Sequence, residues 1–191
     1  MDGVRSQVPE SLPVWMTEYS NTTGIGYGSY DEAFTQAQLI HESLTAGAGM
    51  YLVWQLYRPG GPGEALVVIS PTRGHGGYTV TPKYWTARQY LKYVRPGATR
   101  IGATSADEEL LVSAYLNPDG STVAVFINRS SEPRWAIIDG GDLEAGPRFV
   151  RTSAGEDGVE IPNESTDRFG DRALLLPARS VATVVWSPAG S

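Results

Sequence analysis

The sequence contains no cysteine and only two histidines. The lack of cysteine excludes disulfides, thiolate metal ligands and a cysteine nucleophile. His41 and His75 lie far apart and lack the spacing of a zinc motif. We therefore expect neither a metal nor a cofactor.

Runs of basic residues and long apolar runs are also missing. Fifteen Lys and Arg face 21 Asp and Glu, a net charge of −6, which argues against a nucleic-acid partner because such proteins usually carry a basic patch. No stretch has the length of apolar sequence that crosses a bilayer, so we expect no membrane contact. Residues 1–13 lack the apolar centre of a signal peptide.

The composition is that of a folded protein rich in turns. The chain has 191 residues, of which 41% are hydrophobic and 10% aromatic, with 22 Gly and 13 Pro. This length suits one large or two small domains with a sizeable core.

The first half predicts a strand, a helix and a second strand. Residues 13–19 are apolar and extended, and a capping box, Ser29 to Glu32, predicts a helix that ends near residue 46. Residues 49–59 (GMYLVWQLYRP) are again apolar. Because both extended stretches are almost continuously hydrophobic, we expect parallel strands buried on both faces and joined by a helical crossover.

A further helix is expected to close this half. Residues 65–70 (ALVVIS) read as another extended piece, and Thr81-Pro82 begins a helix with proline at its first position. Arg95-Pro96-Gly97 ends the helix, and we place the domain boundary near residue 97.

The second half changes to short alternating strands. Residues 110–116 alternate, and the turn Asn117-Pro118-Asp119-Gly120 joins them to a second strand in a hairpin. Further strands are expected at 134–139, 147–152, 173–176 and 180–187. This pattern predicts an antiparallel β-sandwich.

One carboxylate stands out because Glu18 ends the first apolar strand. It could be a solvated acid at a strand terminus. It could also be a catalytic carboxylate, because active sites of parallel barrels assemble at the carboxyl ends of the strands.

Several stretches, in order, resemble the C-terminal part of glycoside hydrolase family 30. They are VWMTEYS, MYLVWQLYRP, PKYWTARQYLKYVRPGATRIGATS, LLVSAYLNPDGSTVAVFINRS and LPARSVATVVW. The resemblance implies an α/β plus all-β fold. Residues 1–97 would be the last two β/α units of a (β/α)8 TIM barrel, and residues 98–191 a β-sandwich side domain.

The family resemblance also implies roles for individual residues. Glu18 would be the nucleophile of a retaining glycoside hydrolase, and Trp54, Tyr19 and Tyr57 would bind the substrate, a β-linked polysaccharide such as xylan, glucan or galactan. The family's acid/base glutamate follows an asparagine on an earlier strand. The Asn163-Glu164 pair is not its counterpart, because it lies in a loop of the sandwich.

If the acid/base is missing, the chain alone would be inactive or very weak. The family resemblance further implies an extracellular enzyme. A half barrel would expose an unpaired strand edge, so we expect self-association or a partner chain that completes the barrel.

Two other interpretations remain open. The chain could be a non-catalytic module whose sandwich binds carbohydrate or a partner, or an inactive gene fragment. A row of exposed aromatics on the sandwich would favour the module, and the candidates are Tyr115, Phe126, Trp135, Phe149 and Phe169.

Three stretches match the N-glycosylation pattern, residues 21–23, 128–130 and 163–165.

Overall fold

The structure is a computed structural model, which describes residue 3 and residues 6–19, 26–60, 63–70, 77–139, 146–162 and 173–188. The chain divides into two compact units, Met1–Ala87 and Arg88–Ser191. The Asn163-Glu164 pair, His75, Phe169 and two of the three glycosylation patterns lie outside the described residues.

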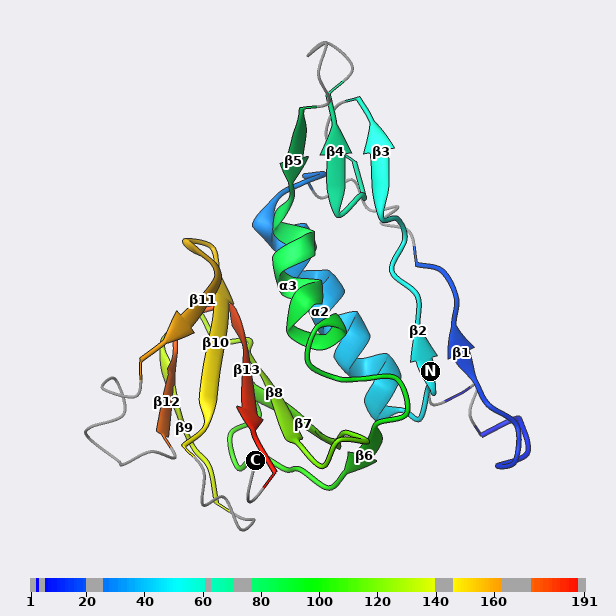
Figure 1. The fold of residues 1–191 in the computed structure, drawn as a ribbon, viewed down its shortest axis with the longest axis vertical. Coiled ribbons are helices and arrows are strands. Elements are labelled where there is room, and N and C mark those ends of the chain that lie inside the picture. Colours follow the sequence, from blue (N-terminus) through cyan, green and yellow to red (C-terminus); the bar gives the residue numbers. More distant parts are fainter. Residues whose placement is uncertain are drawn as a thin grey trace. The chain divides into compact units, whose positions relative to one another are not determined.

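The first unit begins with the predicted strand, helix and strand (Figure 1). β1 (Trp15–Met16) pairs in parallel with β2 (Met50–Tyr51), and α2 (Tyr30–Thr45) connects them. The ladder extends at both ends, since Gly49 N–H donates to the carbonyl of Val14 and Leu52 N–H to that of Met16, each at 2.8 Å. The parallel pairing is thus confirmed, although both strands are shorter than expected.

The capping prediction for α2 is confirmed. Ser29 is the N-cap, and its hydroxyl accepts a hydrogen bond from Glu32 N–H. The Glu32 carboxylate reaches the N–H of Gly28 at 2.7 Å and Lys83 at 3.3 Å, rather than closing the box on Ser29. Glu32 therefore joins the start of α2 to α3 (Pro82–Leu91).

The expectation of strands buried on both faces is wrong. Trp15 is 55% exposed, and Leu52 and Leu56 are also exposed. Burial of such strands needs a sheet neighbour and a helical layer on each side. Among the described residues, β1 and β2 have only each other as sheet partners.

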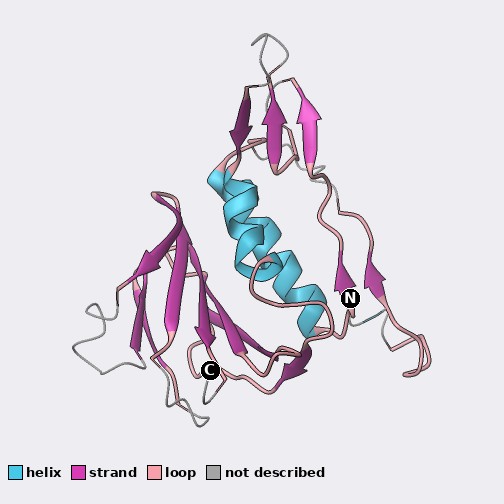
Figure 2. Ribbon diagram, in the orientation of Figure 1, coloured by secondary structure: helices cyan, strands magenta, loops and turns pink. Residues whose placement is uncertain are grey.

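A small sheet follows β2 (Figure 2). Its middle strand lies in the extended piece predicted at residues 65–70, but the pairing of three strands into a sheet was not predicted. β3 (Tyr57–Pro59) pairs in parallel with β4 (Val67–Ile69), which pairs antiparallel with β5 (Tyr78–Val80). α3 then begins at the expected proline but ends at Leu91, before the expected stop. On α3, Leu91 is exposed, whereas Gln89 and Tyr90 are buried.

The second unit is the predicted antiparallel sandwich. Over the described residues, one sheet has the order β11-β10-β13-β8-β7-β6, and β12 pairs with β9 in a second sheet. The strands of this unit are β6 (Thr99–Ile101), β7 (Leu110–Leu116), β8 (Thr122–Asn128), β9 (Arg134–Ile137), β10 (Arg148–Ser153), β11 (Glu156–Ile161), β12 (Ala173–Leu176) and β13 (Ser180–Trp186).

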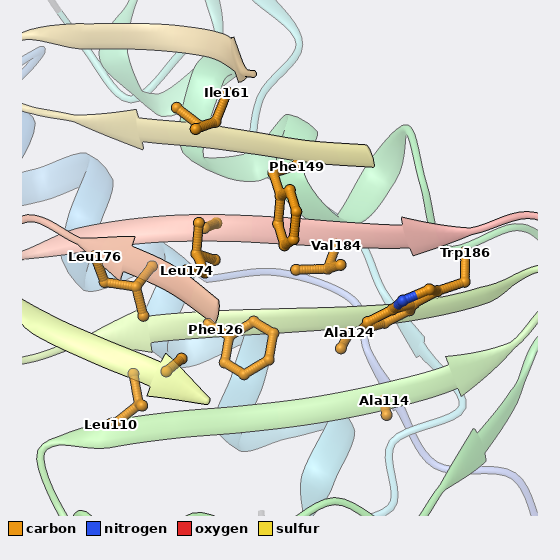
Figure 3. Packing of buried hydrophobic residues seen from close by; sticks show 12 residues of the cluster. Leu110, Ala114, Ala124, Phe126, Phe149, Ile161, Leu174, Leu176, Val184 and Trp186 are labelled. Atoms are coloured by element: carbon orange, nitrogen blue, oxygen red, sulfur yellow. The ribbon is translucent and has the colours of Figure 1, made fainter. Parts of the chain in front are cut away.

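The core of the sandwich lies between the two sheets (Figure 3). Phe149 and Leu174 are fully buried there, and Phe126 and Trp186 nearly so. The hairpin turn forms as predicted: Gly120 has φ +84°, which glycine adopts without strain, and its N–H donates to the carbonyl of Asn117. The β-sandwich prediction is confirmed.

Candidate functional site

Glu18 and Trp54 follow the same end of the parallel strand pair. Glu18 comes two residues after β1, and Trp54 three residues after β2. In parallel strands the carboxyl ends meet at one edge, so both residues belong to that edge. The Glu18 side chain is exposed and Trp54 is 44% exposed, which leaves both open to a ligand.

Tyr19 lies near a buried tyrosine of β2. Burial raises the pKa of the Tyr51 phenol to about 12, and the Tyr19 phenol adds to the shift. The Tyr51 hydroxyl has no hydrogen-bond partner among the described residues. Tyr51 therefore keeps its proton at physiological pH. It lies near Tyr19, the residue that follows Glu18.

Nothing in the sequence singles out Tyr51. It lies in the apolar run that predicts β2, where one more aromatic residue indicates packing. Tyr51 pairs with Met16, which lies two residues before Glu18. This pairing alone shows where Tyr51 lies relative to Glu18.

Tyr57 begins β3 and is 59% exposed. Trp54 therefore follows β2, whereas Tyr57 belongs to β3, although the sequence predicts both residues in one extended stretch. The peptide bond between Trp54 and Gln55 is cis. Arg58 follows Tyr57, and its guanidinium lies against the backbone of Gly63, where a Cβ would come within 2.3 Å of it.

The sandwich does not present the aromatic row that a binding module would show. Tyr115, Phe126 and Phe149 are buried, and Trp135 is 37% exposed. Of the candidates within the described residues, three are therefore buried. Phe126 and Phe149 belong to the core between the sheets, whereas Tyr115 lies on the opposite face of β7.

The sandwich does contain a cavity of about 530 Å³. Its wall is mostly apolar, with Ile101, Phe126, Ile137 and Trp186 among the lining residues, and Asp139 supplies the one carboxylate of the described lining. A pair of carboxylates, which glycoside hydrolysis needs, is absent from this lining.

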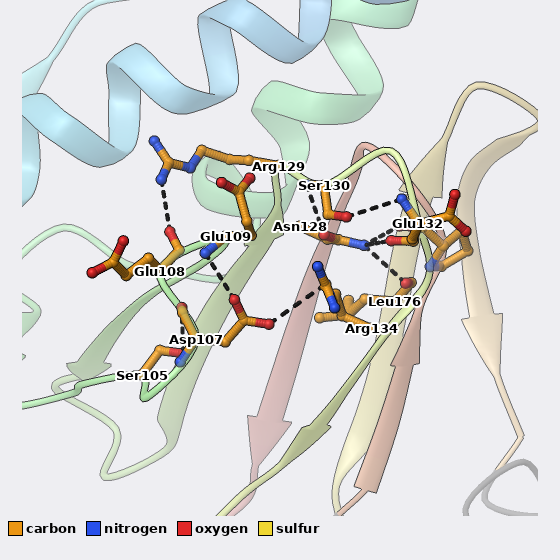
Figure 4. Close-up of polar contacts among 11 residues, drawn as sticks. Ser105, Asp107, Glu108, Glu109, Asn128, Arg129, Ser130, Glu132, Arg134 and Leu176 are labelled. Atoms are coloured by element: carbon orange, nitrogen blue, oxygen red, sulfur yellow. Dashed lines mark hydrogen bonds and ion pairs between the residues drawn. The ribbon is translucent and has the colours of Figure 1, made fainter.

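Asn128 is not available for glycosylation (Figure 4). It is fully buried, and its amide donates to the carbonyls of Glu132, Leu176 and Pro177 at 2.9, 3.1 and 2.8 Å. Its oxygen accepts from Ser130 N–H at 3.0 Å. The Asn-Arg-Ser pattern at 128–130 is thus a structural motif that ties the end of β8 to the turn before β9 and to the end of β12.

No group of side chains in the described part of the chain could hold a metal ion. None of its helices is both long and apolar enough to span a membrane.

The sandwich matches a known family of domains. The model of the glycosyl hydrolase family 30 beta sandwich domain matches residues 97–184. Residues 97–184 form a family 30 β-sandwich domain. The resemblance seen in the sequence is confirmed, and the chain corresponds to the C-terminal part of family 30 proteins.

Relatives match over most of the chain. Glucuronoxylanase XynC of Bacillus subtilis (strain 168) is 28% identical over 177 residues, which make up 90% of this chain and 39% of that protein. The catalytic domain of the family 30 xylanase C from Talaromyces cellulolyticus has 23% identity and a TM-score of 0.77, covering 94% of this chain and 42% of that one.

A conserved exported protein from Bacteroides fragilis has 24% identity and a TM-score of 0.76, over 96% of this chain and 41% of that chain. The chain therefore spans about two fifths of the length of the relatives it matches. The two structural likenesses concern the fold.

Proposed function

We propose that this chain is the C-terminal part of a retaining glycoside hydrolase, with Glu18 as its nucleophile. The observation that carries the proposal is the position of Glu18 at the carboxyl edge of a parallel strand pair, in a chain whose sandwich belongs to family 30. Residues 1–97 would then be the last two β/α units of a (β/α)8 barrel and residues 98–191 its side domain.

Retaining hydrolysis needs two carboxylates about 5–5.5 Å apart. The Glu18 carboxylate would attack the anomeric carbon and release the leaving sugar, and water would then hydrolyse the glycosyl ester. The second carboxyl group, which protonates the leaving oxygen and later activates the water, would come from a segment outside this sequence. General acid assistance is worth about 10²–10⁴-fold in rate, so this chain alone would be very weak on natural substrates.

Three aromatic residues would bind the sugar. Trp54 offers an exposed ring on which the C–H face of a sugar can stack. Tyr19 and Tyr57 would contact sugar hydroxyls with their phenols, and Tyr19 would also position Glu18, which precedes it.

The substrate we propose is a β-linked polysaccharide, with xylan first and glucan or galactan as alternatives. The names of the relatives, a glucuronoxylanase and a xylanase, support this order. An extracellular location agrees with the relative described as an exported protein.

Covalent labelling tests the role of Glu18. The intact chain would be incubated with 2-deoxy-2-fluoro glycosyl fluorides of xylose, glucose and galactose, which carry their own leaving group and need little acid assistance. We expect a mass increase of one fluorosugar on the peptide that contains Glu18. The label should be absent from Glu18→Gln and present in the control Glu10→Gln, which removes another exposed carboxylate of the same unit.

The same experiment separates the alternatives. A folded chain that takes no label from any of the three reagents would favour the non-catalytic module or the inactive fragment. The burial of Tyr115, Phe126 and Phe149 speaks against a sugar-binding face on the sandwich.

A further inference from the structure

The small sheet of β3, β4 and β5 presents one apolar face. Its register aligns Tyr57 with Val67 and Val80, and Pro59 with Ile69 and Tyr78. Aligned residues, and residues two apart on one strand, share a face. The platform, as we call this face, consists of Tyr57, Pro59, Val67, Ile69, Tyr78 and Val80.

The platform is open and carries no charge. Tyr78 is 70% exposed, Tyr57 59% and Ile69 37%. The side chains of Arg58, Val68 and Thr79 alternate to the other face.

The two tyrosines occupy opposite corners of the platform. They are two strands apart across the sheet and two residues apart along it. With a strand spacing of about 4.8 Å and a rise of about 3.3 Å per residue, their Cα atoms are about 12 Å apart. Such a separation would place two rings under different sugars of one chain, with Val67 and Ile69 of the central strand between them as an apolar floor.

We propose that the platform binds a stretch of β-linked polysaccharide chain beyond the sugars held at Glu18 and Trp54. The inference rests on the proposed function and adds a binding surface to it. Tyr57 is one of the residues proposed above to contact the substrate, and it is also part of the platform. A tyrosine ring stacks on the C–H face of a sugar while its hydroxyl bonds to water or to a sugar hydroxyl.

The size and charge of the platform exclude other occupants. Three strands of three residues cover about 140 Å² of sheet. A stable protein–protein interface needs about 800 Å² from each partner, so the platform is too small to hold a second copy of the chain. A nucleic acid would need cations, and none of the six side chains is charged.

Affinity electrophoresis tests the platform directly. The intact chain would be run in native gels that contain soluble β-1,4-xylan, β-glucan or β-1,4-galactan. We expect at least one of these polysaccharides to retard the wild type. Tyr78→Ala should weaken that binding about fivefold or more, Tyr57→Ala should weaken it too, and Tyr78→Trp should retain it.

Thr79→Ala is the matched control, because Thr79 lies on the same strand but on the opposite face. It should bind like the wild type, and circular dichroism would show that each variant is folded. Equal binding by Tyr78→Ala, Tyr57→Ala and the wild type would overturn the proposal. So would a wild type that binds none of the three polysaccharides, or self-association that is lost in Tyr78→Ala.

The labelling of Glu18 distinguishes this proposal from the one it rests on. The fluorosugars are monosaccharides and do not reach the platform, so Tyr78→Ala should still be labelled at Glu18. Labelling with unchanged polysaccharide binding in Tyr78→Ala overturns the platform and leaves the nucleophile in place. Loss of binding in Tyr78→Ala without any labelling overturns the nucleophile and supports the platform as a sugar-binding surface.

Discussion

Nζ of Lys83 lies 3.3 Å from Oε1 of Glu32, and both side chains are less than 5% exposed. The second oxygen of Glu32 accepts the N–H of Gly28. One buried ion pair thus links the loop before α2 to the first turn of α3.

Removal of one member of this pair should be strongly destabilising. Lys83→Met leaves a buried carboxylate without its counter-charge, a change that typically costs about 3–5 kcal/mol. We expect the first unit to unfold at lower urea concentration, as followed by tryptophan fluorescence. The double variant Lys83→Met/Glu32→Gln should recover part of the loss, because it removes both charges. Equal stability of the single and double variants would contradict this account.

Loss of the Asn128 amide should destabilise the sandwich. Asn128→Ala removes the donor of three hydrogen bonds to backbone carbonyls, of which the bond to Leu176 is fully buried, and we expect a decrease of about 2–4 kcal/mol in the free energy of unfolding. The neighbouring variant Arg129→Ala removes an exposed contact with the carbonyl of Glu108 and should change stability by less than about 0.5 kcal/mol.

The burial of Asn128 also predicts an unmodified side chain. The protein produced in a eukaryotic secretory pathway should carry no glycan at position 128 by peptide mass spectrometry. A glycan there would show that the asparagine is modified before the sandwich folds.

The acid stability of the sandwich should depend on Glu156. Hydrogen bonds from the Arg151 guanidinium hold the pKa of the Glu156 carboxyl below its usual value, and the Ser153 hydroxyl adds to the effect. A depressed folded-state pKa contributes stability above the unfolded-state pKa of 4.5, and this contribution is lost as pH falls through the folded value.

We therefore expect Glu156→Gln to lower the stability at pH 7 by up to about 1 kcal/mol, since the pair is partly exposed, and to have less effect at pH 3. Urea unfolding at both pH values measures this difference. Glu160 lies on the same strand as Glu156 and forms an exposed ion pair with Arg148. Glu160→Gln should therefore lower the stability at pH 7 by less than Glu156→Gln does. A larger effect of Glu156→Gln at pH 3 than at pH 7 would contradict a lowered pKa of Glu156 in the folded state.

The exposed apolar residues of the first unit predict self-association. Trp15 and Leu56 are 55% and 64% exposed, and one edge of β1 has no strand partner within the described residues. Such surfaces promote association between chains. Light scattering over a range of concentrations should show oligomers that Trp15→Asp reduces, whereas Leu91→Asp, at an exposed leucine of α3, should not. A monodisperse wild type would disprove this prediction.

Local interactions explain which elements could be predicted from the sequence. The N-cap at Ser29 and the turn at Asn117–Gly120 depend on residues that lie within four positions of one another. The hairpin β7–β8 follows from that turn and from the alternation on either side of it. In each case the deciding contacts are close in sequence.

Non-local contacts explain what could not be predicted. β3 and β5 have three residues each, and no period can be read from so few positions. The exposure of Trp15 depends on which strands lie next to it, so the apolar character of its strand wrongly indicated burial on both faces.

The candidate site was predictable only in its outline. The order of motifs singled out Glu18, and the parallel register puts it at the same edge as Trp54. The proximity of Tyr19 to Tyr51 and the separation of Tyr57 onto another strand both depend on pairings that the sequence does not state.

Gln89 decides where the sandwich can be cut from the chain. Its amide donates to the hydroxyl of Thr152 at 2.7 Å, and the hydroxyl of Thr183 donates to its side-chain oxygen at 2.7 Å and to its backbone oxygen at 2.8 Å. A recombinant domain that begins at residue 97, where the family match starts, would leave both threonines buried without these partners. An excised sandwich should therefore keep the end of α3 and begin no later than Arg88, the first residue of its compact unit.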